Sequence, residues 1–172
     1  MQDVQLNIDR INVTLRESLL SLFQDQLRKE MEELDCHYFA HNLIQNYYKP
    51  GHTVSSFYSN PEWQQEYWHN YWDLDLMAHK VHQVAETDGF AISSWDFIDP
   101  DSDVMKRRKS VCDLYDGVQF TFKHEDGLLE NYSFGWKKSG RGKMGFEKLL
   151  KLSDVVSDFR DAHLKLVSAP TP

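Results

Sequence analysis

One stretch of sixteen residues, from Phe57 to Trp72, constrains the fold more than any other part of the chain. Its sequence, FYSNPEWQQEYWHNYW, contains seven aromatic residues. Pro61 suits the first position of a helix, because its ring fixes φ and its missing N–H would have no partner there. Asn60, directly before it, is a good helix cap. The sequence therefore predicts that a helix begins at Pro61.

A helical path divides this stretch into an aromatic half and a polar half. Trp63, Tyr67 and Tyr71 fall on one stripe, and Trp68 and Trp72 fall on the next. Buried indole N–H and phenol O–H groups need hydrogen-bond partners, so this face suits a pocket for an amphipathic small molecule. The alternative is an aromatic-rich core helix, which the spacing alone favours because most apolar stripes are core.

Hydrophobic periodicity and turn residues predict the other elements, and the strands sum to five. The expected elements are long helices at 12–34 and 146–167, a hairpin of strands at 36–45 and 53–58, a helix after 73–75 that ends near Asp88-Gly89, a strand from Phe90 that ends at Trp95, a helix at 104–112, and a second hairpin of 117–123 and 128–137 with Gly127 in its turn. This order is typical of an α+β fold, with one five-stranded antiparallel sheet covered by helices on both faces.

Length and charge limit the classes of function. The 172 residues fit one domain, expected at 1–167, and the last five residues, SAPTP at 168–172, are typical of a linker. A formal charge of −8 argues against a nucleic-acid-binding surface. Only two cysteines are present, at no metal-type spacing, and no segment has the composition of a signal peptide or a membrane span. We expect a cytoplasmic protein with no membrane contact.

Motifs for catalysis are weak. His79 and His82, with Asp73 and Asp75 nearby, lack the pattern of a zinc enzyme, and the glycine-rich segment 135–145 fails the spacing of a phosphate-binding loop. No nucleophile can be paired with a base. We expect no enzymatic activity, no metal and no cofactor.

Two charged segments have simple interpretations. The basic run from Lys106 to Lys109 is predicted to be a solvated helix face. Asp75, which follows the aromatic helix, either caps the next helix or accepts a hydrogen bond from the amide N–H of a ligand lying along Trp63 and Tyr67. Spacing does not choose between the two roles.

The residues from Asn60 to Leu76 read NPEW-x₃-Y-x₇-D-L. This pattern resembles the signature of the autoinducer-binding domain of LuxR-type quorum-sensing regulators, and Trp95 and Gly117 are similar to a later tryptophan and glycine of that family. The resemblance implies a PAS-like α-β-α sandwich. It also implies that Trp63 would donate to a ring carbonyl of the ligand, that Tyr67 would line the acyl side, that Asp75 would accept from the amide, and that Trp95 would close the head-group end.

The sequence therefore predicts a signal-sensing domain that binds an acyl-homoserine-lactone-like or other amphipathic signal. The expected ligand-binding residues are Trp63, Tyr67, Asp75, Trp95, Tyr71, which continues the aromatic stripe, and Ser59, which stands four residues before Trp63. The alternative is a stand-alone protein-interaction domain whose own aromatics fill the pocket. A drug-sized ligand needs about 300 Å³, so the pocket volume discriminates between the two. We further expect a homodimer formed through the terminal helices, with DNA bound only by a helix-turn-helix domain outside this chain.

Overall fold

The computed structural model describes residues 17, 21, 27–44, 53–95, 99–124, 127–137 and 146–167. The chain forms two compact units, of which the larger is Asp35–Arg141. The smaller consists of Met1–Leu34 and Gly142–Pro172, and it contains the helices α2 (Arg28–Glu33) and α6 (Phe146–Val167). The predicted helix at 146–167 is confirmed. Most of the predicted helix at 12–34, the turn at 49–51 and the tail at 168–172 lie outside the described residues.

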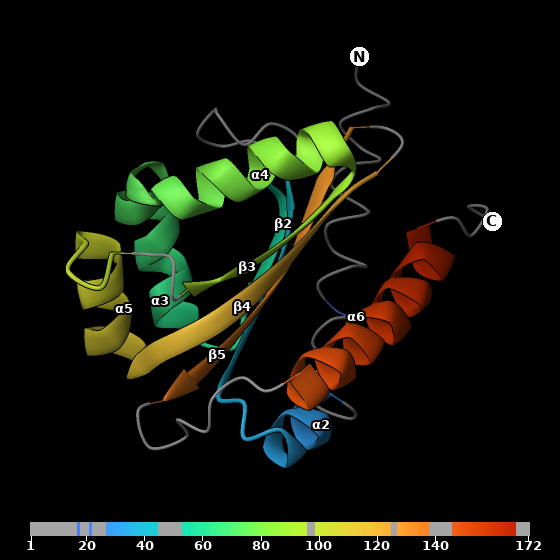
Figure 1. Ribbon diagram of the computed structural model, residues 1–172, viewed down its shortest axis with the longest axis horizontal. Coiled ribbons are helices and arrows are strands. Elements are labelled where there is room, and N and C mark those ends of the chain that lie inside the picture. The colour runs from blue at the N-terminus through green and yellow to red at the C-terminus, as the bar shows by residue number, and fades with distance from the viewer. Residues whose placement is uncertain are drawn as a thin grey trace. The chain divides into compact units, whose positions relative to one another are not determined.

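The larger unit is built on a five-stranded antiparallel sheet. Its strands follow the order β2-β1-β5-β4-β3, so both edges belong to short strands (Figure 1). The strands are β1 (Tyr38–Ile44), β2 (Thr53–Tyr58), β3 (Phe90–Ser94), β4 (Leu114–Lys123) and β5 (Leu129–Lys137). The predicted α+β class and both predicted hairpins are therefore confirmed.

Between β2 and β4 the chain forms three α-helices, and the first of them continues into two short turns of other helix types. α3 (Pro61–Glu66) continues as a π-helical turn, η2 (Tyr67–Tyr71), and a 3₁₀ turn, η3 (Trp72–Leu74), and it is followed by α4 (Leu76–Asp88) and α5 (Asp103–Cys112). The Asn60 side chain accepts a hydrogen bond from the Trp63 N–H at 3.0 Å, which confirms the predicted start of the helix. Gly89 ends α4 with φ of +82°, a conformation that glycine adopts without a steric penalty.

The two faces of the sheet differ in chemistry, because side chains alternate along each strand. One face carries the fully buried phenylalanines Phe39, Phe120 and Phe134, with ring centroids of Phe39 and Phe134 5.4 Å apart, and it also carries the polar pair of His41 and Glu130. The other face carries Asn42 on β1 and Asn131 on β5, which lie opposite each other in the register of the two strands. The polar face is the one that contributes to the candidate site.

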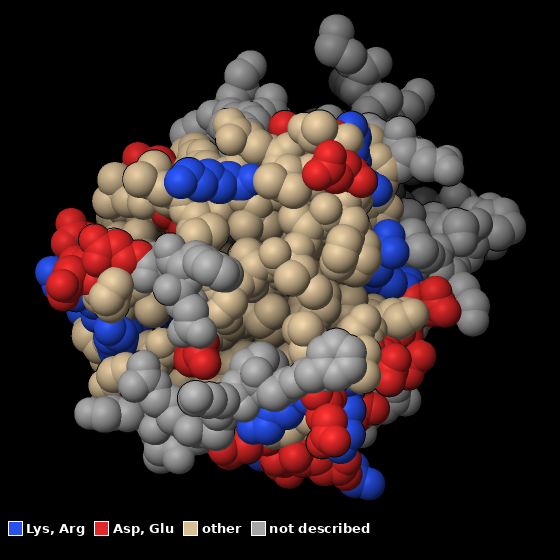
Figure 2. All heavy atoms as spheres, in the orientation of Figure 1, with Lys and Arg blue, Asp and Glu red and all other residues tan. Residues whose placement is uncertain are grey.

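Charged residues of both signs are interspersed on one face of the molecule. On the face shown in Figure 2, Lys and Arg of the described residues lie among Asp and Glu and form no continuous positive patch. None of the helices in the described part of the chain is both long enough and apolar enough to cross a lipid bilayer.

Candidate ligand-binding site

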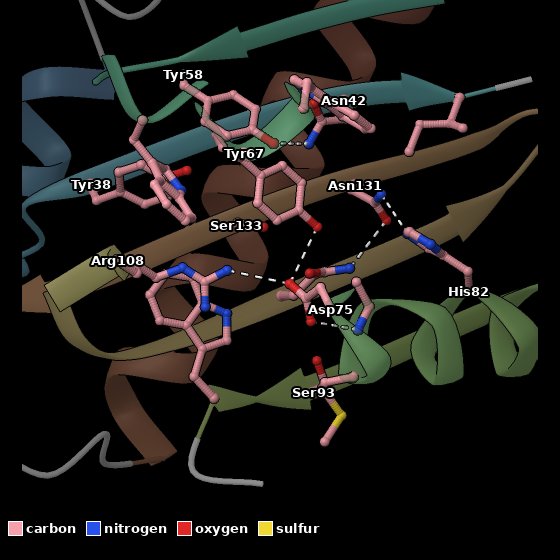
Figure 3. A pocket seen from close by; sticks show the side chains of 18 residues that line it. Tyr38, Asn42, Tyr58, Tyr67, Asp75, His82, Ser93, Arg108, Asn131 and Ser133 are labelled. Atoms are coloured by element: carbon pink, nitrogen blue, oxygen red, sulfur yellow. Dashed lines mark hydrogen bonds and ion pairs between the residues drawn. The ribbon is translucent and has the colours of Figure 1, made fainter. Parts of the chain in front are cut away.

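The polar face of the sheet and the helices α3, α4 and α5 enclose a pocket (Figure 3). Its cavity volume is about 30 Å³, which is room for about one water molecule. The pocket is lined by Tyr38, Ala40, Asn42, Ile44, Tyr58, Trp63, Tyr67, Trp68, Asp75, Met77, Ala78, His82, Ser93, Trp95, Arg108, Gln119, Asn131 and Ser133. In this conformation the protein's own side chains nearly fill the site.

Asp75 lies at the centre of the pocket wall and has two roles. Its Oδ1 accepts a hydrogen bond from the Ala78 N–H at 3.1 Å, so it caps α4. Its Oδ2 accepts from the Tyr67 hydroxyl at 3.2 Å and lies 3.4 Å from Nη2 of Arg108. The structure therefore shows the predicted cap, and it leaves the second oxygen inside the pocket.

Arg108 corrects the prediction that 106–109 is a solvated face. Lys106 is exposed, but Arg108 is only 5% exposed. The physical reason is the helical period, because Arg108 stands four residues after Val104 and four before Cys112, and both of these residues are buried. That spacing was the sequence signal that could have identified Arg108.

The guanidinium of Arg108 lies between aromatic rings. Its Cζ is 4.3 Å from the ring centroid of Trp95 and 5.5 Å from that of Trp63, both within cation–π range. Its Nη1 is 3.1 Å from Sδ of Met105, which is a weak acceptor. The cation is thus held largely by ring faces and by one carboxylate.

A chain of hydrogen bonds crosses the sheet side of the pocket. The Thr121 hydroxyl donates to Oδ1 of Asn131 at 2.7 Å, and Nε2 of Gln119 donates to the same oxygen at 3.4 Å. The Asn131 amide N–H donates to Nε2 of His82 at 2.6 Å. Burial lowers the pKa of His82 to about 3, so this imidazole is neutral near pH 7 and its Nε2 can accept.

A second polar chain lies toward β2. The Trp68 indole N–H donates to the Ser56 hydroxyl at 2.9 Å, and that hydroxyl donates to Oδ1 of Asn42 at 2.7 Å. The Asn42 amide donates to the Tyr58 hydroxyl at 3.4 Å. Burial raises the pKa of Tyr58 above its ordinary value, so this phenol is also neutral. The charges in the pocket are therefore those of Asp75 and Arg108.

Four of the six predicted site residues line this pocket: Trp63, Tyr67, Asp75 and Trp95. The other two lie beside it. Tyr71 stacks on Trp63, with ring centroids 5.8 Å apart, and the Ser59 hydroxyl accepts a hydrogen bond from the Phe39 N–H at 3.0 Å. Sequence reasoning missed the polar residues of the sheet, although the alternation of Asn131 and Ser133 along one strand is a period-2 signal for a shared face.

His79 and His82 have separate partners in the structure. Nε2 of His79 is 3.2 Å from the Trp72 carbonyl oxygen, whereas Nε2 of His82 contacts Asn131. No group of three or more potential metal ligands is found among the described residues.

The Trp95 indole packs closely against two glycines of the sheet, Gly117 and Gly135. A Cβ at Gly117 would overlap the Trp95 indole and lie 2.6 Å from the Phe134 carbonyl oxygen, and a Cβ at Gly135 would lie 3.1 Å from the same indole. Glycine at both positions therefore allows the ring to reach the guanidinium of Arg108.

We predict that Gly117→Ala lowers the free energy of unfolding by about 1–3 kcal/mol, the scale of overpacking, and displaces Trp95. Gly135→Ala is the graded control and should have a smaller effect, because its contacts can relax by a few tenths of an ångström. Urea denaturation measures the free energy of unfolding of both variants. Equal stability of Gly117→Ala and the wild type would contradict the close approach of Trp95.

A second cavity lies next to the first and shares Asp75 and Met77 with it. This outer groove has a volume of about 210 Å³, and its wall includes Leu74, Leu76 and Val104. Leu74 and Leu76 are 52% and 72% exposed, so apolar surface reaches solvent here. Asp75 thus stands between a small polar pocket and a larger, more apolar groove.

Comparison with solved structures identifies the fold. By sequence, the chain matches no protein-family model and no curated protein. By structure, it is similar to SdiA from Escherichia coli, with a TM-score of 0.58 and 16% identity over 93% of this chain and 71% of that one. It is also similar to the ligand-binding domain of VqsR from Pseudomonas aeruginosa, with a TM-score of 0.56 and 11% identity over 97% of each chain. The chain therefore has the fold of the autoinducer-binding domain of LuxR-type regulators.

Proposed function

We propose that this chain is the signal-sensing domain of a LuxR-type regulator and that it binds a small amphipathic molecule at Asp75 and Arg108. The observation that carries the proposal is the pair itself, a carboxylate and a guanidinium that are each about 6% exposed and that meet inside a pocket with polar walls. A buried pair is weak evidence for stability, since apolar residues of the same size often serve as well. Groups of both charges in an enclosed site do suit the recognition of a polar ligand.

The shared fold and the positions of the predicted residues support the same proposal. Trp63, Tyr67, Asp75 and Trp95 were selected from the sequence pattern, and they converge on one pocket from α3, η2, the start of α4 and the end of β3. Their roles toward a ring carbonyl, an acyl group and an amide remain part of the proposal.

The small volume of the inner pocket favours the second candidate function. A cavity of about 30 Å³ is far below the roughly 300 Å³ of a typical ligand site. A domain that fills its pocket with its own aromatics and Arg108 would act as a protein-interaction module of the same fold. Ligand binding instead requires the inner pocket to widen, with the apolar part of the ligand in the outer groove beside Leu74 and Leu76.

We predict that a pocket-filling substitution separates the two functions. Ala40 lies on β1 in the pocket wall and is 2% exposed, so Ala40→Leu should place three more carbon atoms in the cavity and abolish ligand binding. Ala91→Leu is the matched control, because Ala91 is also buried, at 7% exposed, but packs in a separate cluster with Val81, Ala85 and Leu129.

The measurement is mass spectrometry of small molecules released when the purified proteins are denatured, with circular dichroism to confirm folding. The sensing function predicts a released molecule from the wild type and Ala91→Leu, and none from Ala40→Leu. The self-filled alternative predicts that no variant releases one. Release from all three proteins alike would place the bound molecule outside this pocket.

The remaining partners are part of the proposal. We propose that the chain forms a homodimer through its terminal helices, and analytical sedimentation measures this.

We also propose that DNA is bound only through a domain outside this chain. The net charge of −8 supports this second proposal, because DNA binding draws much of its affinity from clustered Lys and Arg.

A further inference from the structure

Arg108 is a buried cation with too few acceptors. A guanidinium has five N–H donors in a planar fork. Nη2 is 3.4 Å from Asp75 Oδ2, a long hydrogen bond, and Nη1 points at the Met105 sulfur. Nε has no hydrogen-bond partner in the part of the chain that the structure describes. Hydrogen bonds to charged groups are normally shorter, near 2.8 Å, so the pairing in the pocket is incomplete.

Asp75 does not supply the hydrogen-bond acceptors that Arg108 lacks. Its Oδ1 is used by the Ala78 N–H, and its Oδ2 is shared between the Tyr67 hydroxyl and Arg108. Leaving donors of a buried charged group unpaired is costly, so the site favours a ligand that adds an acceptor. The rings of Trp95 and Trp63 contact the guanidinium through their faces and accept no conventional hydrogen bond from it.

The geometry points to an anionic ligand: we propose that the signal carries a carboxylate, or a group of the same shape, next to an N–H donor, and that Arg108 binds the anion while Asp75 accepts from the N–H. This inference rests on the proposed function. A carboxylate matches the fork of Arg with two parallel hydrogen bonds. Because Asp75 and Arg108 lie side by side, the acid and the N–H must be separated by only a few atoms of the ligand. An N-acyl amino acid has this arrangement.

The rest of the pocket agrees with a polar and short ligand. The sheet side presents the polar side chains Asn42, Gln119, Asn131, Ser93 and Ser133, and this wall offers a long alkyl chain little apolar surface to contact. A short acyl group fits the outer groove beyond Asp75.

A matched pair of probes tests the inference. N-butanoyl-L-homoserine lactone is neutral, and its ring-opened form, N-butanoyl-L-homoserine, differs only in a free carboxylate and hydroxyl. Isothermal titration calorimetry at neutral pH should show that the wild type binds the ring-opened acid at least about tenfold more tightly, which corresponds to about 1.4 kcal/mol.

Arg108→Gln should remove this preference. Arg107→Gln is the control, because it makes the same change one residue earlier on α5, where Arg107 pairs with Glu66 and is 41% exposed. It should bind both probes like the wild type. If Arg108→Gln does not fold, the selectivity of the wild type still decides the question.

Each outcome is informative. Equal or tighter binding of the lactone by the wild type would overturn this inference and leave the proposed function standing. A preference for the acid that persists in Arg108→Gln would also overturn the role of Arg108. Binding of neither probe, together with no molecule released on denaturation, would overturn the proposed function as well.

Discussion

Asp75→Asn is expected to lower the free energy of unfolding by about 3–5 kcal/mol, the cost of removing one partner from a buried ion pair. Asparagine has nearly the same shape and is an equally good helix cap, so the hydrogen bond to the Ala78 N–H can persist. The change removes the charge and also replaces Oδ2, the acceptor for Tyr67 and Arg108, with an N–H donor. It leaves Arg108, 5% exposed, with no other carboxylate paired to it among the described residues.

A double-mutant cycle tests this explanation. Arg108→Met removes the cation and keeps an apolar side chain against Trp63 and Trp95, while Asp75 retains Tyr67 and Ala78. We expect this variant to lose less stability than Asp75→Asn. The double variant should regain most of the loss, because replacing both members of a buried pair is often neutral.

Urea denaturation of the four proteins measures the coupling. A decrease of less than about 1 kcal/mol in the free energy of unfolding of Asp75→Asn would fall in the range of solvent-exposed ion pairs. It would show that water reaches the guanidinium of Arg108. Additive losses in the double variant would show that the two residues do not interact.

Local chemistry explains which parts of the fold could be predicted. Asn60 before Pro61 begins a helix, Gly89 ends one with a positive φ, and Gly127 turns between β4 and β5 with φ of +84°. Each of these signals acts within a few residues, so the element boundaries follow from sequence. The π-helical turn at Tyr67–Tyr71 was not predicted, because the pattern assumes a uniform helical period.

The candidate site was only partly predictable, because its key pairs join distant parts of the chain. Arg108 contacts Asp75 across 33 residues of sequence, and His82 contacts Asn131 across 49. Neither pair has a local signature, since each depends on how the helices pack on the sheet. Trp63, Tyr67 and Asp75 were found because they belong to one continuous motif.

A second buried cluster lies in the sheet around Glu130, and we expect a substitution there to change the free energy of unfolding strongly. Glu130 is 3% exposed and accepts hydrogen bonds from three side chains. The Tyr132 hydroxyl lies 2.5 Å away, Nε2 of His124 2.8 Å and Nε2 of His41 3.0 Å. Burial alone would raise the pKa of Glu130, but the hydrogen bonds from His124, His41 and Tyr132 hold it well below its usual value.

Glu130→Gln is expected to lower the free energy of unfolding at pH 7 by about 3 kcal/mol, because it weakens several hydrogen bonds to a charged acceptor. Glu86→Gln is the matched control: Glu86 is an exposed residue of α4, so the same substitution there should change stability by less than about 0.5 kcal/mol.

The effect of Glu130→Gln should depend on pH in a defined direction. A carboxyl whose pKa is lower in the folded state contributes stability that is present above its unfolded pKa, near 4.5, and is lost as the pH falls toward the folded pKa. The difference between the wild type and Glu130→Gln should therefore be present at pH 7 and shrink as the pH falls below about 4.5. Urea denaturation across this range measures it. A difference that grows as the pH falls below about 4.5 would mean that Glu130 is protonated in the folded protein, and the three hydrogen bonds would then have to be reassigned.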